Sequence, residues 1–256
     1  MFDGIRDTLW LFTAAVFRIN ESQPEYRGTC TFVRAAGKDG ILTAAHLWDS
    51  LRGDSFGLAL GDNLRILEIN KAVVKPFIIK GKRFDRDGPD LAFVEIPQLD
   101  VQRIQQRKAF FNLDRRKKGK LAISPTYQSG LWSVLGAVEE QSEFNPTEAC
   151  LGLRVYACGF PNAETRGGHD YLELPYDRRS SPQLPTSFGG ISGSGLWQVL
   201  IAKSRRTQQV NLSHAELEGV AFFQEPDANS SSRGVIRCHA RQSLYSALLS
   251  VIGTAI

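Results

Sequence analysis

The sequence predicts an all-β protein that ends in an α-helix. Short β-patterned runs bounded by turn residues recur along most of the chain, and a polar, basic segment separates two groups of them. Near the C-terminus the apolar residues change to helical spacing. With 256 residues and 42% apolar content, the chain can bury one large core or two smaller ones.

The first group of predicted strands lies within residues 1–100. Residues 28–33 and 41–45 flank a glycine-containing turn at 37–40, and this hairpin ends at His46. Further β-patterned runs follow at 58–60, 64–74 and 91–96. These runs predict a first β unit over residues 1–100.

A linker and a second β unit follow. Residues 101–120 are polar and basic, with Arg115-Arg116-Lys117-Lys118 at their centre, which is typical of a connection between two units. The second unit, 121–242, has predicted strands at 121–123, 131–138, 153–158, 195–201 and 219–223. Ser243 is a possible N-cap for a helix over 243–256, whose apolar residues are Leu244, Tyr245, Leu248, Leu249, Val251 and Ile252.

Three motifs supply candidate catalytic residues. Their sequences are Thr43-Ala44-Ala45-His46, Asp90-Leu91-Ala92 and Gly190-Ile191-Ser192-Gly193-Ser194. A serine hydroxyl becomes a nucleophile when an imidazole takes its proton and a carboxylate orients that imidazole. The backbone N–H groups of Gly190 and Ser192 could then bind the oxyanion. Glycine at 190 and 193 allows positive φ and lets a substrate carbonyl approach without a Cβ in the way. Each motif alone is also typical of a turn or strand end, so the hypothesis depends on their combination.

The order His46, Asp90, Ser192 separates this chain from other triad hydrolases. The α/β-hydrolases run Ser, Asp, His and the subtilisins run Asp, His, Ser. On these three motifs the chain resembles trypsin-like (chymotrypsin-fold) serine peptidases of the bacterial type, from about residue 13 to the end. The resemblance implies two six-stranded antiparallel β-barrels with a C-terminal α-helix, and a triad in the cleft between the barrels.

The chain also departs from the animal digestive members of that family. Ile191 precedes the serine where they have an aspartate that receives a new amino terminus, so activation by that route is not expected. The resemblance places Thr186 at the floor of the primary pocket, where an acid would be needed for strict Lys or Arg preference. It further assigns substrate-binding positions to Phe222, which replaces a serine that supports the triad acid, and to Phe223 and Gln224.

Other features narrow the expected environment. His169, His214 and His239 are expected to be surface or packing residues, and no His/Cys spacing matches a zinc site, so no metal or cofactor is expected. The four cysteines show no pairing pattern, and no signal peptide or membrane-spanning run is evident. These features predict a cytoplasmic protein that does not associate with a membrane. The net charge of +4 and scattered basic runs do not favour nucleic-acid binding.

The sequence therefore predicts an intracellular serine endopeptidase that hydrolyses protein or peptide substrates through an acyl-enzyme. A more specific hypothesis is a conditionally activated effector of bacterial stress or antiphage defence, controlled by an activating or inhibiting protein partner. The alternative is a catalytically latent pseudoprotease that binds an extended peptide or partner protein by strand addition. Phe222 in place of the supporting serine favours that alternative.

Overall fold

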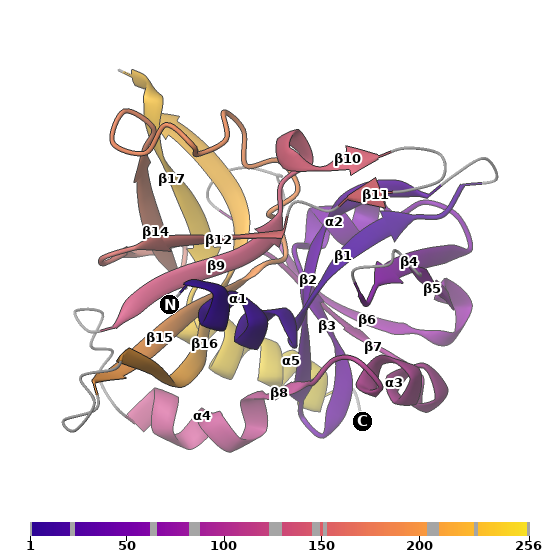
Figure 1. Ribbon diagram of the computed structural model, residues 1–256. Helices are drawn as coiled ribbons and strands as arrows, with labels where there is room; N and C mark the ends of the chain where they lie inside the picture. The colour runs from indigo at the N-terminus through magenta and orange to yellow at the C-terminus, as the bar shows by residue number, and fades with distance from the viewer. Residues whose placement is uncertain are drawn as a thin grey trace.

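The computed structural model describes residues 2–20, 24–61, 66–81, 88–122, 130–144, 149–150, 153–203, 210–227 and 230–254. The described chain is mostly β, with two large antiparallel sheets side by side (Figure 1). The first sheet comes from the N-terminal part of the chain and the second from the C-terminal part. The candidate catalytic residues are therefore divided between two separately formed sheets.

The first sheet has the strand order β5-β4-β1-β2-β3-β7-β6, and β8 joins β2 in parallel. Its strands are β1 (Thr13–Arg18), β2 (Glu25–Ala35), β3 (Lys38–Thr43), β4 (Ser55–Ala59), β5 (Ile66–Asn70), β6 (Lys75–Lys80), β7 (Asp90–Glu95) and β8 (Phe111–Asn112). Its helical segments are α2 (Ala45–Ser50), the 3₁₀ turn η1 (Lys71–Val73) and α3 (Gln98–Gln105).

The second sheet has the order β12-β9-β15-β16-β17-β14-β13. Its strands are β9 (Leu131–Ala137), β12 (Leu153–Cys158), β13 (Asn162–Arg166), β14 (His169–Asp177), β15 (Gly195–Lys203), β16 (Val210–Asp227) and β17 (Ser230–His239). A small hairpin, β10 (Glu143–Phe144) with β11 (Ala149–Cys150), follows the 3₁₀ turn η2 (Glu139–Gln141). The remaining helical segments are α1 (Phe2–Trp10), α4 (Leu113–Ala122), η3 (Ser243–Leu248) and α5 (Leu249–Gly253).

The two sheets share one scheme of strand pairing. Six strands of each can be lettered A to F in chain order: β1, β2, β3, β4, β6 and β7 in the first, and β9, β12, β14, β15, β16 and β17 in the second. Both sheets contain the antiparallel pairs A–B, A–D, C–F and E–F. The first adds B–C and the second adds D–E. Each is thus the ring A-B-C-F-E-D, opened between a different pair of strands.

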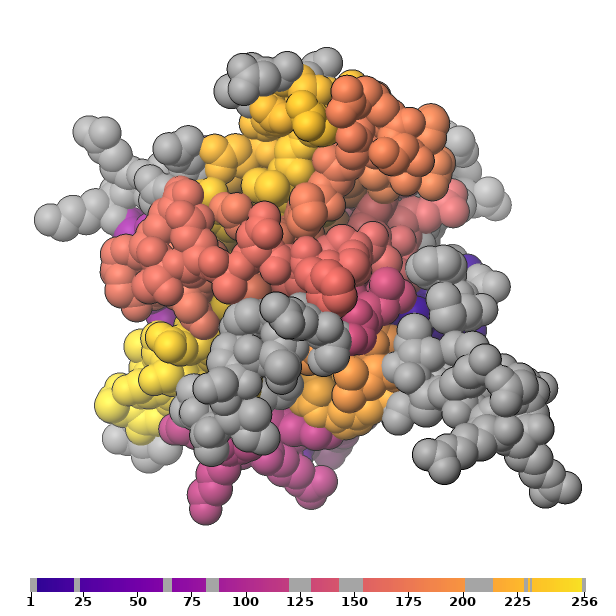
Figure 2. Space-filling model, turned by 90° about the vertical axis from the view of Figure 1, so that its left-hand side faces the viewer, coloured from indigo at the N-terminus to yellow at the C-terminus, as the bar shows by residue number. Residues whose placement is uncertain are grey.

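Three large apolar clusters, and a smaller one around Phe17, hold these elements together. One belongs to the first sheet, around Phe32 and Phe56, and a second belongs to the second sheet, around Trp132. A third lies between the sheets and includes Leu9 of α1 and Leu248 of η3, so both ends of the chain pack into it. Figure 2 shows that the segment from β12 through β13 crosses the middle of the outer face of the second sheet, with α4 below it.

Most of the predicted strands are confirmed, and the differences have local causes. The hairpin before His46 and the strands at 91–96, 131–138, 153–158, 195–201 and 219–223 correspond to β2–β3, β7, β9, β12, β15 and β16. The strand predicted at 121–123 is wrong, because 121 and 122 belong to α4, while 123 lies outside the described residues. No strand is predicted at β6, an edge strand that contains Pro76, a residue that sheets tolerate at edges.

The C-terminal helix is present, but Ser243 does not cap it as predicted. The carboxylate of Asp170, at the start of β14, accepts the N–H groups of Gln242 (2.7 Å) and Ser243 (2.9 Å). Ser243 Oγ donates to the same carboxylate. A carboxylate from a distant strand thus satisfies the first helical amides, a long-range contact that the local sequence does not reveal.

Candidate active site

His46 and Asp90 meet at the edge between β3, α2 and β7. His46 lies in the first turn of α2, directly after β3, and Asp90 is the first residue of β7, which pairs with β3. Asp90 Oδ2 lies 2.5 Å from His46 Nδ1, and Asp90 Oδ1 accepts the backbone N–H of His46 at 2.8 Å. The side chain of Asp90 is 7% exposed and that of His46 is 28% exposed. The carboxylate is therefore buried while the imidazole reaches solvent.

This two-point contact fixes the chemical state of the imidazole. An ionised carboxylate only accepts hydrogen bonds, so His46 Nδ1 carries the proton that it donates to Asp90. Nε2 then presents a lone pair, which is the state that a general base needs. The pair can take a proton at Nε2 and stabilise the resulting imidazolium.

A second histidine lies on the other side of Asp90. The backbone N–H of Asp90 donates to His239 Nε2 at 2.9 Å, and the ring of His239 stacks on Phe222 with centroids 4.4 Å apart. His239 is fully buried, and burial lowers its pKa to about 3. The sequence predicts a surface or packing role for His239, and the structure shows packing. Its contact with the main chain of Asp90 had no sequence signal.

Ser192 is carried by residues 186–194, here called the nucleophile loop, which precede β15. Two of its side chains, Phe188 and Ile191, are buried in the core of the second sheet. The carbonyl of Ser192 accepts the N–H of Thr29 from β2 at 3.0 Å. The Ser192 hydroxyl donates to the carbonyl of Phe222 over a long 3.4 Å. The second sheet therefore anchors the loop, and the first sheet fixes the main chain at the serine.

Nearly all backbone N–H groups of the nucleophile loop are committed to acceptors. Seven have partners: Thr186 and Ser187 with the Glu140 carboxylate, Phe188 with Gln224 Oε1, Gly189 with Ser187 Oγ, Ile191 with Phe188 O, Gly193 with Ala221 O, and Ser194 with Ile191 O. In the described part of the chain, the N–H groups of Gly190 and Ser192 have no acceptor. These are the two groups that the sequence analysis assigned to an oxyanion hole.

Two carbonyls show where those N–H groups point. In a trans peptide the C=O of one residue and the N–H of the next point in opposite directions. The carbonyl of Gly189 accepts the N–H of Glu139 at 2.9 Å, so the Gly190 N–H points away from Glu139. The carbonyl of Ile191 accepts the N–H of Ser194 at 3.0 Å, so the Ser192 N–H points away from that turn. Both N–H groups therefore point away from the hydrogen-bonded interior of the loop.

Glycine is required at two positions of the loop. Gly190 has φ +91° and Gly193 has φ +89°, as the sequence analysis expected. A Cβ on Gly190 would lie 2.6 Å from the ring of Tyr26, and one on Gly193 would lie 1.9 Å from Thr29 O. Substrate access is one reason for a missing Cβ at these positions. The contacts show that docking of the loop against β2 is a further reason.

The residues predicted to bind substrate lie at the start of this loop and on β16. Thr186, expected at a pocket floor, is exposed and bonds to Glu140. Gln224 joins the loop to β14, since its Oε1 accepts the N–H of Phe188 and its Nε2 donates to Tyr176 Oη at 2.9 Å. Phe223 is half-buried against the first core. A cavity of about 290 Å³ beside Gln224 is largely apolar, lined among others by Tyr156, Leu174, Tyr176, Leu184, Phe188 and Ile236.

Other reactive groups offer less for chemistry. Cys30, Cys158 and Cys238 are free thiols, and burial raises the pKa of Cys30 to about 12 and that of Cys158 to about 11. Thiols in this state are poor nucleophiles near neutral pH. Among the residues that the structure describes, no cluster of His, Cys, Asp and Glu could hold a metal ion, and no helix is long and apolar enough to cross a membrane.

Comparison with known proteins gives limited information. No protein-family model and no curated protein matches the chain. One similar solved structure comes from work on the intrinsically disordered Sesbania mosaic virus VPg protein: 16% identity, TM-score 0.49, covering 92% of this chain and 89% of that chain. Another is granzyme C, a chymotrypsin-fold serine protease: 14% identity, TM-score 0.48, covering 96% and 92%. Similarity at this level leaves activity to be argued from the geometry of this chain.

Proposed function

We propose that this protein is a serine endopeptidase of the chymotrypsin type, with His46, Asp90 and Ser192 as its catalytic triad. The N–H groups of Gly190 and Ser192 form the oxyanion hole. The substrates are proteins or peptides, and the reaction needs no cofactor because the nucleophile, the base and the anion-binding donors all come from the chain.

The proposal includes the architecture. The shared pairing scheme of the two sheets supports two six-stranded barrels, each a ring of strands A to F. The proposed units are residues 1–100, a linker at 101–120, residues 121–242 and a C-terminal helix at 243–256. α3, β8 and α4 give the linker segment structure of its own.

The observation that carries the proposal is the hydrogen-bond accounting of the nucleophile loop. Buried N–H groups are normally paired with protein acceptors or ordered water, whereas an N–H group at a solvent-accessible residue can stay available for a ligand. Side chains of Glu140, Gln224 and Ser187 accept four amides of this loop and backbone carbonyls accept three more, yet no described residue accepts the N–H of Gly190 or Ser192. Donors fixed in this way are suited to a charge that develops only during reaction.

The proposed reaction follows from these groups. Ser192 Oγ attacks the scissile carbonyl while His46 Nε2 takes the hydroxyl proton, and Asp90 stabilises the imidazolium. The carbonyl oxygen becomes an anion bound by the two N–H groups, each worth about 3–4 kcal/mol in comparable enzymes. His46 then gives its proton to the leaving amine. Water, activated by the same imidazole, hydrolyses the acyl-enzyme and restores Ser192.

Fluorophosphonate labelling tests the proposed nucleophile. The purified protein should be modified at Ser192, located by mass spectrometry of the labelled peptide, and His46→Ala should abolish the modification because the base is lost. Cleavage of a denatured protein library, with new termini identified by mass spectrometry, then tests peptide-bond hydrolysis. A folded protein that is neither labelled nor cleaves any library peptide would contradict the proposal.

A second candidate function is peptide binding without catalysis. The observation that favours it is the hydrogen bond from Ser192 Oγ to the Phe222 carbonyl, which occupies the hydroxyl. At 3.4 Å this bond is long, and catalytic hydrogen bonds often form only in the substrate complex. A peptide that binds with wild-type affinity to both the wild type and Ser192→Ala, and that neither protein cleaves, would support this function instead.

A further inference from the structure

We infer that the turn η2 (Glu139–Gln141) positions the oxyanion donors, through the backbone N–H of Glu139 and the carboxylate of Glu140. This inference rests on the proposed function, since it concerns how the same site is held ready. Neither residue touches the proposed triad, so both are positioning residues. Their contacts are with the nucleophile loop at two separate points.

The first contact controls one peptide group. The N–H of Glu139 donates to the carbonyl of Gly189 at 2.9 Å. If the peptide between Gly189 and Gly190 rotated by half a turn, the Gly189 carbonyl would replace the Gly190 N–H as the group that faces the oxyanion of the proposed reaction. Rotation requires the loss of the Glu139 bond. This single backbone bond therefore opposes conversion of a donor site into an acceptor site.

The second contact holds the start of the same loop. The carboxylate of Glu140 accepts the N–H of Thr186 at 2.9 Å, the N–H of Ser187 at 2.9 Å and the hydroxyl of Thr186. These hydrogen bonds lower the pKa of Glu140, with the Thr186 hydroxyl as the largest cause. A charged acceptor that bridges two consecutive amides fixes their orientation more strongly than a neutral one would.

The two contacts act through a short chain of bonds. With Ser187 held by Glu140, its hydroxyl accepts the N–H of Gly189 at 3.1 Å. Gly189 is thus held at its N–H through Glu140 and Ser187, and at its C=O by Glu139. The other supports of the loop act elsewhere: Gln224 holds Phe188, and Tyr26 and Thr29 hold the carbonyl of Gly190. The peptide 189–190 therefore depends mainly on η2.

A proline substitution tests the Glu139 bond directly. Glu139→Pro removes the backbone donor together with the side chain, and it suits the site because Glu139 begins a 3₁₀ turn and the preceding Val138 is extended (φ −105°, ψ 126°). Glu139→Ala keeps the N–H and isolates the side chain. Gln141→Ala, on the same turn but bonded to Tyr156 and Gln183, reports general disturbance of the turn.

Two readouts separate positioning from folding. Crystal structures of the variants show the orientation of the 189–190 peptide, and the second-order rate of fluorophosphonate labelling shows its consequence. Loss of one oxyanion donor costs about 10²–10³-fold, so Glu139→Pro should slow labelling by about 10–100-fold, and Glu140→Ala by less. Glu139→Ala should have at most a tenth of the effect of the proline. Glu140→Gln should recover part of the loss caused by Glu140→Ala.

Each outcome bears on one of the two ideas. A rotated 189–190 peptide in Glu139→Pro supports the inference even if the wild type is never labelled, in which case the proposed function alone fails. An unrotated peptide together with wild-type labelling overturns the inference and leaves the proposed function intact. Equal losses of labelling rate in Glu139→Pro and Gln141→Ala would also overturn it, because the loss would then result from general disturbance of the turn.

Discussion

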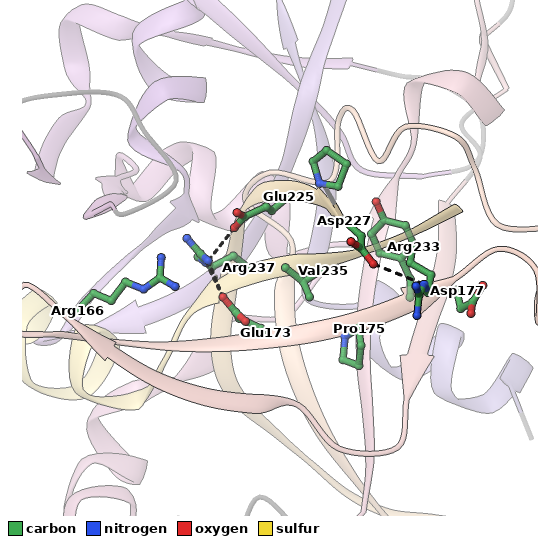
Figure 3. A pocket seen from close by; sticks show the side chains of 12 residues that line it. Arg166, Glu173, Pro175, Asp177, Glu225, Asp227, Arg233, Val235 and Arg237 are labelled. Atoms are coloured by element: carbon green, nitrogen blue, oxygen red, sulfur yellow. Dashed lines mark hydrogen bonds and ion pairs between the residues drawn. The ribbon is translucent and has the colours of Figure 1, made fainter. Parts of the chain in front are cut away.

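The nucleophile loop and the pocket between β14, β16 and β17 are both rich in polar groups, but they satisfy them differently. In the pocket, Arg237 lies between the carboxylates of Glu173 (2.6 Å) and Glu225 (2.8 Å), and Arg233 lies 3.5 Å from Asp227 (Figure 3). The side chain of Arg237 is only 2% exposed, so its charge is balanced almost entirely within the protein. The nucleophile loop instead has two N–H groups, those of Gly190 and Ser192, for which the described residues supply no acceptor.

This difference separates a structural pocket from a candidate active site. The charged pocket has a volume of about 610 Å³, larger than the cavity of about 290 Å³ beside the nucleophile loop. Size alone would therefore favour the charged pocket over the candidate active site. A reaction needs groups whose hydrogen-bonding capacity is unused before substrate binds, and such groups occur at the loop. Variants of the two regions should consequently affect different quantities, activity for one and stability for the other.

The largest expected effect is on catalysis. Ser192→Ala should lower kcat by about 10⁴–10⁶-fold, because the proposed triad works as a unit, with an unchanged unfolding transition. Ser194→Ala, two residues later, should change kcat far less, since this serine is buried and its hydroxyl has no hydrogen-bond partner among the residues that the structure describes. Both follow from peptide hydrolysis rates measured beside thermal melts. If Ser194→Ala removed activity and Ser192→Ala did not, the nucleophile would have been assigned to the wrong serine.

The next largest effect is on stability, and it belongs to the pocket. Arg237→Ala leaves Glu173 and Glu225 without their shared partner and should reduce the free energy of unfolding by about 3–5 kcal/mol. The triple variant Arg237→Met, Glu173→Leu, Glu225→Leu should recover much of that loss, because it buries no unpaired charge. Urea denaturation gives the values. A loss of activity in a folded Arg237 variant would show that the pocket participates in function.

A smaller effect is the pH dependence of stability at His239, a second buried residue of β17. Arg237 is buried in its charged form, whereas His239 is buried in its neutral form. Because burial lowers the folded-state pKa of His239 from 6.5 to about 3, its neutral form stabilises the protein above pH 6.5. That contribution is lost as pH falls from 6.5 towards 3. Relative to His239→Gln, the wild type should lose about 1.4 kcal/mol of unfolding free energy per pH unit below about pH 6.

Urea denaturation of both proteins between about pH 7 and pH 5 measures this difference, in a range where ordinary carboxylates stay ionised. Glutamine can still accept the N–H of Asp90, so the substitution removes titration while keeping an acceptor. The other histidines are common to both proteins and cancel in the comparison. A wild-type to variant difference that does not vary with pH would show that His239 is not held neutral.

How far the sequence predicts this molecule depends on the range of the interactions. Local signals were sufficient for the β2–β3 hairpin before His46 and for positive φ at Gly190 and Gly193, because turn chemistry is local. The supports of the site come from far along the chain: Tyr26 and Thr29 contact Gly190, and Glu140 contacts Thr186. Nothing in the neighbourhood of those residues in sequence indicates such contacts, so they were not predicted.

The smallest expected effect is at the contact between the first sheet and the loop. Tyr26 Oη lies 2.8 Å from the carbonyl of Gly190 and 2.6 Å from that of Ala137, and one hydroxyl proton serves both. Tyr26→Phe keeps the ring against which Gly190 packs and removes only this donor, so the free energy of unfolding should fall by about 1 kcal/mol. Thr29 Oγ1 still donates to the Gly190 carbonyl at 2.9 Å and limits the loss of activity.

Removing both donors sharpens the comparison between the two regions. Thr29→Val alone should lower the free energy of unfolding about as much as Tyr26→Phe. The double variant leaves the Gly190 carbonyl with neither hydroxyl donor, so its loss of unfolding free energy should exceed the sum of the two single losses. The rate of fluorophosphonate labelling should fall together with the free energy of unfolding, because this carbonyl belongs to the peptide that leads into Ile191 and Ser192. A double-mutant cycle on unfolding free energy and labelling rate measures both couplings. Strict additivity in both would mean that the first sheet supports the loop without orienting it, and that the donors at Gly190 and Ser192 are fixed by the second sheet and η2 alone.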